Sequence, residues 1–346
     1  MRWEHELSKW EIDRVGKVLV WWNNWSQHFF DALKEIHAYR KQHYYPMVTI
    51  NNSIKSRIKT RSLWNITYTL SQRLKRLQSI ILKLTNEDKE TDKMQLSRMQ
   101  DIGGIRIVTK SIGDVIKLSE ILSNTKWIRK YQVKRLKNYI YEPSKDGYRG
   151  VHIIYNFKDK ESSRDFSIEL QIRTEIQHIR AMAVETFTMF SGEDIKFRQW
   201  DSIIRSYFEL VADGFSMLEW GVLSANRKTI PKEKIFCEIK KQTDDLQIIE
   251  KLHGFQKIFH SINNKEINNK HKEYILTIDK KNKKLYTIIY KDSLWQDFIS
   301  SEQDENLISV LVKVDNVKKI KSTYPSYYAD TNLFIEKIKE ICAYCK

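Results

Sequence analysis

Hydrophobic residues recur at helical spacing near the start of the chain. A period of three to four positions predicts a helix within residues 10–45, and it is formed by Trp10, Ile12, Val15, Val18, Leu19 and Trp22. Residues 72–83 are basic and also predict a helix. The polar residues 85–92 predict a loop. The first part of the chain is therefore expected to be mainly helical.

The pattern changes to short strands after this loop. Ile105, Ile107 and Val108 predict one strand, and residues 150–157 predict another. Residues 114–122 lie between them and predict a helix. Strands that alternate with helices indicate a sheet covered by helices.

A further strand, residues 165–173, is expected to have two different faces. Its hydrophobic side chains point one way and its polar side chains point the other, because side chains alternate along a strand. The polar side chains are Ser167, Glu169, Gln171 and Arg173. Residues 174–190 then predict a helix with His178, Met182 and Glu185 on one side.

The composition shifts at residues 226–234, and we predict a domain boundary there. The expected domains are residues 1–228 and residues 229–346. The second domain is expected to be a small α+β unit, with strands at 273–279, 285–291 and 309–314 and a closing helix at 332–342. The predicted fold class is α+β, a mixed sheet flanked by helices plus this unit.

Composition narrows the class of protein. The chain has 346 residues, of which 41% are hydrophobic, so it is long enough for a core and is not expected to be disordered. No apolar run is long enough to span a membrane, and the first residues do not resemble a secretory signal. The three cysteines do not predict a disulfide framework, and Cys342 and Cys345 lack the partners of a zinc site. These features predict a cytoplasmic protein.

Charge points towards an anionic ligand. The formal net charge is +16, and residues 49–86 contain no Asp or Glu. Such a stretch attracts polyphosphate or nucleic acid, although it is also compatible with a solvated basic helix face. Its basic residues are Lys55, Arg57, Lys59, Arg61, Arg73, Lys75, Arg76 and Lys83.

Two carboxylates are the main candidates for chemistry. The chain has neither a Walker A loop nor a dinucleotide glycine fingerprint, so phosphate would be bound by side chains. Asp101 precedes a Gly-Gly strand entry, and Glu169 lies on the polar face of its strand. Carboxylates on neighbouring strands form a minimal Mg²⁺ site when phosphates complete the shell. Taken singly, each is more often a surface or capping residue.

Tyr148 and His178 are ambiguous by themselves. Tyr148 lies in the glycine-flanked segment 146–150 and is able to stack on a base, although loop tyrosines are common. His178 lies near a hydrophobic helix face, where most histidines are structural.

Four segments, taken together and in order, resemble the RelA/SpoT synthetase family. They resemble its basic helix region, its metal-aspartate motif, its acceptor-stacking loop and its glutamate strand with the following helix. The segments are residues 73–84, 96–106, 137–152 and 169–185, within a resemblance over about residues 40–220. The sequence departs from the family pattern at Asn138, Gly150 and Arg180 and lacks the His-Asp pair of the family's hydrolase.

The resemblance implies an ATP-dependent pyrophosphokinase with a nucleotidyltransferase-like synthetase fold. It implies that Asp101 and Glu169 hold Mg²⁺ and act in catalysis. The implied ATP-binding residues are Arg73, Lys75, Ser79, Lys83 and Arg106. The implied acceptor-binding residues are Tyr148, His152, Gln171 and Arg173.

The acceptor is open between the 3′ end of tRNA and GDP or GTP. Residues 310–330 resemble the tail of CapRel-type fused toxin–antitoxin synthetases, in which tyrosines cover the ATP site. Tyr324 and Tyr327 would be these regulatory residues, unless they are simply the aromatic core of a small domain. This resemblance and the basic stretch favour tRNA, inhibition of translation, and release of inhibition by a phage protein in antiviral defence.

Overall fold

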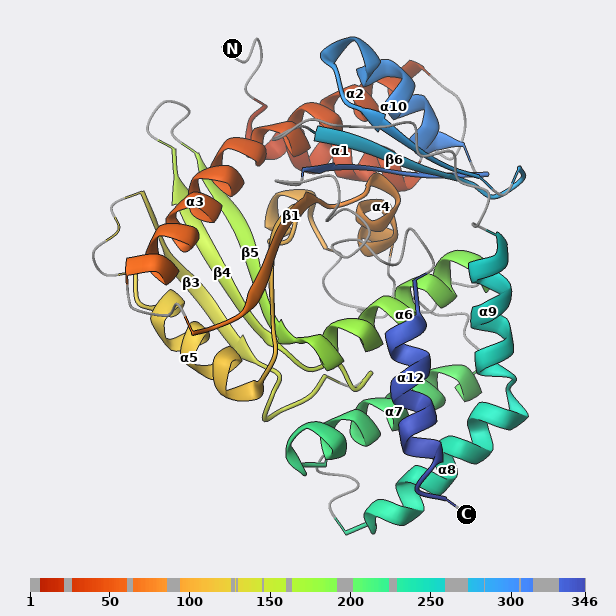
Figure 1. The fold of residues 1–346 in the computed structure, drawn as a ribbon. Coiled ribbons are helices and arrows are strands. Elements are labelled where there is room, and N and C mark those ends of the chain that lie inside the picture. Colours follow the sequence, from red (N-terminus) through yellow and green to blue (C-terminus); the bar gives the residue numbers. More distant parts are fainter. Residues whose placement is uncertain are drawn as a thin grey trace.

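The computed structural model has an α+β fold, in which helices flank one mixed sheet (Figure 1). This confirms the predicted fold class. A group of helices that includes α7 (Ser202–Trp220), α8 (Lys232–Asp245), α9 (Ile248–Ile258) and α12 (Asn332–Cys342) lies to one side of the sheet. The structure describes residues 7–21, 27–60, 65–85, 94–125, 128, 130–144, 146–159, 164–191, 202–223, 229–258, 273–282, 284–304, 306–313 and 330–345.

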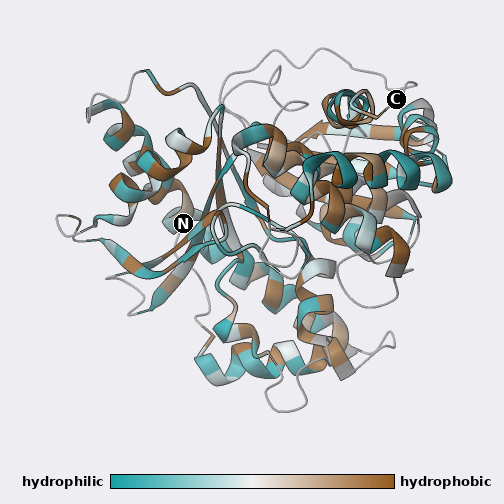
Figure 2. Cartoon of the chain, turned by 90° about the horizontal axis from the view of Figure 1, so that it is seen from below, coloured by the Kyte–Doolittle hydropathy of each residue, from teal (hydrophilic) through white to brown (hydrophobic). Residues whose placement is uncertain are grey.

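Three helices begin the chain. They are α1 (Lys9–Trp21), α2 (Gln27–Gln42) and α3 (Tyr44–Thr60). The buried residues Ile12, Val15 and Leu19 lie on one side of α1, which confirms the predicted helical spacing. The helices carry both hydrophobic and hydrophilic residues along their length, as expected of amphipathic helices (Figure 2).

The sheet has eight strands in the order β3-β4-β5-β2-β1-β8-β6-β7. Only the β2–β5 pair is parallel among the paired strands, and the other pairs are antiparallel. The strands are β1 (Tyr68–Leu74), β2 (Gly103–Thr109), β3 (Tyr131–Asn138), β4 (Val151–Lys158), β5 (Asp165–Thr174), β6 (Glu273–Asp279), β7 (Lys284–Ile289) and β8 (Leu307–Lys313).

The two faces of the central strands differ as predicted. Ile105, Ile107 and Leu170 are fully buried in a core that also contains Ile54 of α3 and Val115 of α5 (Ile112–Ser123), the helix that follows β2. Residues 104, 106, 169 and 171 alternate with these positions, so they lie on the opposite face. One face of the sheet therefore packs against α3, and the other carries the polar side chains.

One helix prediction was wrong in part. Residues 72–74 belong to strand β1, and only from Leu77 does the basic segment form a helix, α4 (Leu77–Thr85). Leu74 is buried on the core face of the sheet, so sheet packing decides its conformation. Arg73 consequently lies on a strand beside β2, not on a helix.

Three more helices complete the central part of the chain. They are α5 (Ile112–Ser123), α6 (Glu175–Ser191) and α7 (Ser202–Trp220). The hydroxyl of Thr174 accepts from the backbone N–H of Gln177, and the side chain of Gln177 accepts from the N–H of Thr174. This reciprocal cap starts α6 directly at the end of β5.

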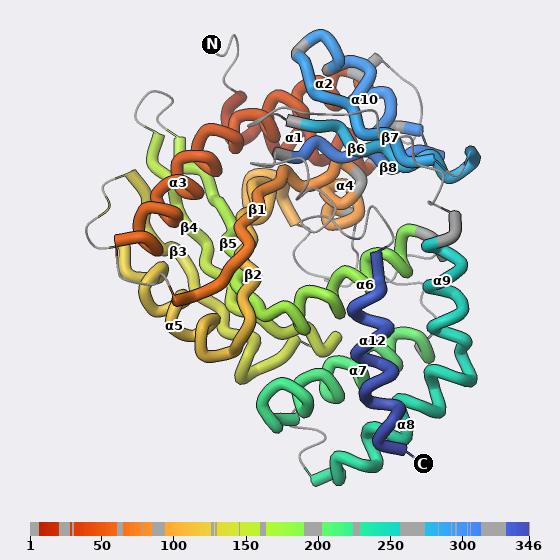
Figure 3. The backbone as a smooth tube through the Cα atoms, viewed as in Figure 1, coloured from red at the N-terminus to blue at the C-terminus, as the bar shows by residue number. Residues whose placement is uncertain are grey.

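The C-terminal strands do not form a sheet of their own. Strand β8 pairs with β1 and thereby joins β6 and β7 to the central sheet (Figure 3). The C-terminal helices are α8 (Lys232–Asp245), α9 (Ile248–Ile258), α10 (Trp295–Gln303) and α12 (Asn332–Cys342). The expected boundary at residue 228 stays a prediction.

Helices α8 and α12 share a core with α6 and α7. Phe236, Ile338 and Val211 are each fully buried in it. Gly214 of α7 lies directly against Ile239 and Ile341, so a side chain at this position would collide with them. Glycine at this position therefore lets the two isoleucine side chains pack directly against α7.

The sequence predicted no disulfide framework, and the structure has one disulfide that the sequence did not point to. Cys237 of α8 and Cys345 form one across 108 residues of sequence, and their Cα atoms lie 5.4 Å apart. Cys342 is free and half-buried. None of the helices in the described part of the chain has the length and apolar character needed to cross a membrane.

Candidate active site

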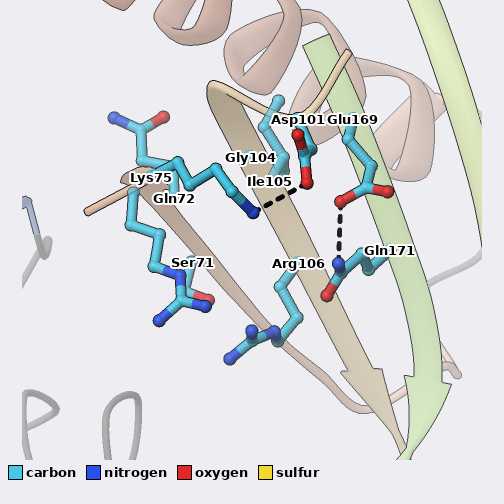
Figure 4. A pocket seen from close by; sticks show the side chains of 10 residues that line it. Ser71, Gln72, Lys75, Asp101, Gly104, Ile105, Arg106, Glu169 and Gln171 are labelled. Carbon is cyan, nitrogen blue, oxygen red and sulfur yellow. Dashed lines mark hydrogen bonds and ion pairs between the residues drawn. The ribbon is translucent and has the colours of Figure 1, made fainter. Parts of the chain in front are cut away.

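An open cavity of about 480 Å³ lies on the polar face of the sheet (Figure 4). Strands β1, β2 and β5 supply most of its lining. The lining residues are Ser71, Gln72, Arg73, Lys75, Asp101, Gly104, Ile105, Arg106, Glu169 and Gln171. Nine of these ten residues lie within the segments that resembled synthetase motifs or directly beside them, because β-pairing brings those segments together.

Strand register aligns the charged residues in rows across the sheet. Arg73 pairs with Gly104, and Gly104 pairs with Glu169. Since Gly104 has no side chain, nothing projects from the sheet between Arg73 and Glu169. The next row joins Arg106 to Gln171. The cavity therefore has a carboxylate on one side and guanidinium groups on the other.

Asp101 lies between two lysines. Lys75 Nζ donates to Oδ2 at 2.8 Å, and Lys83 Nζ donates to Oδ1 at 2.9 Å. Burial alone would raise the pKa of Asp101, but the charges and hydrogen bonds of Lys75 and Lys83 lower it to about 2. Asp101 is therefore an anion at neutral pH.

Glu169 is held by two partners beside Asp101 (Figure 4). Gln171 Nε2 donates to its Oε2 at 2.7 Å, and His152 Nδ1 lies 3.0 Å from its Oε1. Burial would raise the pKa of Glu169, but the hydrogen bond and charge of His152 lower it. Burial would lower the pKa of His152, but the interactions with Tyr148 and Glu169 raise it to about 10. This pairing keeps Glu169 ionised.

Arg73 and Arg106 line the other end of the cavity, and the buried Arg173 lies near Arg106. Arg73 forms an ion pair with Glu185 of α6, with 3.3 Å between Nη1 and Oε1. Burial and the neighbouring guanidinium of Arg173 lower the pKa of Arg106. Guanidinium groups keep their charge in proteins, so Arg106 and Arg173 add positive charge here. Positive charge concentrated in this way suits a polyphosphate ligand.

Aromatic residues gather on the β4 side of the cavity. The hydroxyl of Tyr148 lies 2.7 Å from His152 Nε2. The rings of Tyr148 and Tyr139 meet edge to face, with 5.8 Å between their centres. Lys137 Nζ lies 5.6 Å from the Tyr139 ring centre. Gly147 (φ +75°) adopts a left-handed conformation that favours glycine, and it shapes the loop that carries Tyr148.

Residues 72–189 match the family model described as the region found in RelA/SpoT proteins. This part of the chain is therefore similar to the region found in RelA/SpoT proteins. It includes Asp101, Glu169 and the arginines of the cavity.

One curated relative is the GTP pyrophosphokinase YwaC of Bacillus subtilis, with 31% identity over 105 residues. The match covers 30% of this chain, and the chain spans about half the length (49%) of this relative. Among solved structures, small alarmone synthetase 1 of Bacillus subtilis bound to pppGpp is 20% identical, over 52% of this chain and 92% of that chain, with a TM-score of 0.40. A GTP pyrophosphokinase family protein of Streptococcus pneumoniae is 19% identical, over 60% and 93%, with a TM-score of 0.37.

The structure brings most of the expected site residues together around this cavity. Lys83 contacts the cavity residue Asp101. Tyr148 contacts His152, which in turn contacts the cavity residue Glu169. Arg173 lies two positions beyond Gln171 on β5 and is buried. Ser79 is half-buried on α4 and does not line the cavity. Tyr324 and Tyr327 lie outside the described residues.

The sequence did not predict the contacts of four residues in or near the cavity. Ser71 and Gln72 line the cavity because β1 begins at Tyr68, whereas residues 72–83 were expected to be helical. Glu185 was placed only on a helix face, and its pairing with Arg73 depends on how α6 packs. Tyr139 joins Tyr148 because β3 and β4 are neighbours. The alternation of Thr69, Ser71 and Arg73 with Leu70 and Leu74 was the available signal for β1.

The donor chemistry fits Mg²⁺. Carboxylate oxygens from one or two residues, completed by phosphate oxygens, are the ligands that Mg²⁺ prefers, and Asp101 and Glu169 would supply them. Both carboxylates already face cationic side chains, so this position attracts positive charge. The described residues contain no cluster of three or more His, Cys, Asp or Glu suited to a metal.

A second cavity of about 310 Å³ lies behind the Tyr148 loop and is lined by Glu219, among other residues. We expect the titration of Glu219 to make the stability of the chain depend on pH. Burial raises the pKa of Glu219 to about 7, against the lowering effects of Thr174 and Arg149. The folded chain then binds more protons than the unfolded chain between about pH 4.5 and 7, so stability falls as pH rises through this window. Between pH 5 and pH 8 the unaltered chain should lose about 1–3 kcal/mol of unfolding free energy through Glu219. The Glu219→Gln chain should not show this loss. Urea unfolding of both chains at the two pH values measures it, and equal pH dependence would contradict it.

Proposed function

We propose that the chain is a pyrophosphokinase that transfers the β,γ-pyrophosphate of ATP to a hydroxyl of GDP or GTP. The observation that carries this proposal is the pair Asp101 and Glu169 in a cavity lined by Arg73, Lys75 and Arg106. The RelA/SpoT region and the relative named a GTP pyrophosphokinase support it.

The basic residues would bind and orient ATP. Lys75, Lys83 and Arg73 are placed to neutralise the triphosphate, and Arg106 has a planar guanidinium that can stack on adenine. When ATP arrives, its phosphate oxygens would compete with Asp101 for the two lysines. Asp101 would then be released to hold Mg²⁺ together with Glu169. The metal would offset the charge that develops on the phosphates.

Glu169 is the proposed general base. Its carboxylate would accept the proton of the acceptor hydroxyl, whose oxygen forms a bond to the β-phosphorus. The bond from the β-phosphorus to the α–β bridging oxygen breaks, and AMP leaves. His152 and Gln171 each hold one oxygen of Glu169, so they orient the base.

The arrangement of basic residues supports a free nucleotide as the acceptor. The acid-free stretch does not form one surface: Ile54 and Ile58 fix α3 on the core face, whereas Arg73 and Lys75 line the cavity on the other face. Lys55 and Lys59 are thereby separated from the cavity by the sheet. Tyr148 and Tyr139 instead form a small aromatic cluster, of a size that suits one base.

The 3′ end of tRNA is the second candidate acceptor. Lys134 and Arg135 are exposed on β3, the edge strand, and Lys137 pairs with His152 of the site. An RNA backbone would be able to follow this edge to the cavity, because phosphate contacts need exposed basic side chains. In that case the product would be a tRNA that cannot be aminoacylated.

Parallel acceptor assays test the two candidates. The full-length chain is given ATP labelled on the γ-phosphorus, with GDP, GTP or deacylated tRNA as the acceptor. Asp101→Ala is the control. Label in the guanine nucleotide, lost with the control variant, is the expected result. Label in tRNA alone would establish the second candidate, and label in neither would contradict both.

Regulation by the C-terminal segment stays a prediction. We propose that Tyr324 and Tyr327 restrict the ATP site and that a phage protein releases them, by analogy with CapRel-type synthetases. In the full chain, Tyr324→Ala combined with Tyr327→Ala should raise basal transfer. An unchanged rate would contradict inhibition by these tyrosines.

A further inference from the structure

A buried carboxylate of the C-terminal segment contacts the helix that carries Lys83. Glu302 lies on α10, and its side chain is 3% exposed. Its Oε1 accepts from the backbone N–H of Leu77, the first residue of α4, at 3.2 Å. These residues are 225 positions apart in the sequence. The first backbone N–H of helix α4 is therefore capped by Glu302, which is distant in the sequence.

Arg40 of α2 holds Glu302 in place. Its Nη1 and Nη2 donate to Oε2 and Oε1 at 2.7 and 3.3 Å, and Arg40 is 2% exposed. His37 Nδ1 lies 2.9 Å from Arg40 Nη1. A bidentate pair of this kind fixes the orientation of the carboxylate. The oxygen that caps α4 thus has one defined position.

The capped segment carries both lysines of Asp101. Lys75 lies two residues before Leu77, and Lys83 lies six residues after it. The backbone N–H of Lys75 donates to the Ile102 carbonyl at 2.8 Å, next to Asp101. Glu302 therefore anchors the segment between the two lysines. An anionic partner at a helix N-terminus also offsets the positive end of the helix dipole.

The C-terminal segment reaches the cavity at a second point. Val312 of β8 pairs with Arg73 of β1, and Lys313 pairs with Gln72. Arg73 and Gln72 both line the cavity. Strand β8 and helix α10 are therefore next to the same side of the site, the side that holds the basic residues (Figure 3).

We infer that Glu302 is a positioning residue for the ATP triphosphate: it fixes the start of α4 so that Lys75 and Lys83 stay at Asp101. This inference rests on the proposed function for the identity of the ligand. It makes the C-terminal segment a structural part of the donor site, whatever regulation its other residues provide.

Glu302→Ala in the full-length chain tests the inference. We expect the KM for ATP and the dissociation constant of a non-hydrolysable ATP analogue to rise about fivefold to tenfold, the effect of losing a helix cap. The KM for the acceptor should not change. Amide hydrogen exchange in α4 should accelerate. Glu302→Gln keeps an oxygen that can accept from Leu77, so it should restore most of the affinity.

Two further variants separate positioning from general destabilisation. Ile338→Ala removes a fully buried side chain from the α12 core and leaves α4 untouched, so ATP affinity should stay unchanged. If Glu302→Ala does not fold, Arg40→Met combined with Glu302→Met replaces the ion pair by apolar packing, and the loss of ATP affinity should persist.

Two results would overturn the inference. One is unchanged or tighter analogue binding in both Glu302→Ala and the double variant. The other is an equal loss of ATP and acceptor affinity. Analogue binding and hydrogen exchange need no turnover, so these results stay distinct from a failure of the proposed function, which would show as no transfer by the unaltered chain.

Discussion

Glu169→Gln should reduce pyrophosphate transfer by about 10³-fold or more while the chain stays folded. The amide keeps the size of the side chain and can still bond to Gln171, but it can neither accept a proton nor provide the charge that faces His152 and Asp101. Steady-state transfer from ATP to GDP or GTP measures the rate, and thermal unfolding confirms the fold.

Glu175→Gln is the matched control for this variant. Glu175 is an exposed carboxylate at the start of α6, six positions after Glu169, and pairs only at the surface with Lys110. It should transfer at the rate of the unaltered chain, because exposed ion pairs contribute little. A Glu169→Gln chain that keeps more than a tenth of the activity would remove Glu169 from the proposed chemistry.

Deletion of residues 229–346 should leave an unstable or unfolded chain, not an activated one. The deletion removes Phe236, Ile239 and Ile338, which are fully buried against α6 and α7. Each such side chain contributes about 1.5–3 kcal/mol when buried, and the total stability of a domain is about 5–15 kcal/mol. It also removes the β8 partner of β1 and the Glu302 partner of Arg40.

Circular dichroism and analogue binding of the shortened chain measure this outcome. The full-length chain with Tyr324→Ala and Tyr327→Ala is its control, because that chain removes the proposed inhibitory tyrosines and keeps the sheet and the buried core. A shortened chain that is folded, soluble and more active than the full chain would contradict the prediction. It would also support a division of the chain near residue 228.

The sequence predicted the polar strand faces of the candidate site better than the surroundings of the site. The alternation along β5 placed Glu169 and Gln171 on a polar face, because period-two patterns report directly which side of a strand is buried. The Gly-Gly pair after Asp101 was equally informative, since it begins β2 and leaves the sheet open beside Glu169. These signals are local in the sequence.

The missed features depend on contacts between distant segments. Residues 72–74 of strand β1 were expected to be helical together with the residues that follow, and pairing with β2 and β8 makes them extended. The C-terminal strands were expected in a separate unit, because nothing local indicates that β8 joins β1. The same holds for the Glu302–Leu77 contact and for the Cys237–Cys345 disulfide.

The position of the transferred phosphorus tests the central claim most directly. The full-length chain is incubated with GDP or GTP and with ATP labelled on the β-phosphorus, and the products are separated. The account predicts that the label moves to the acceptor, with one unlabelled AMP released for each acceptor modified. Label that remains in ADP would show transfer of a single phosphate, and the chain would then not be a pyrophosphokinase.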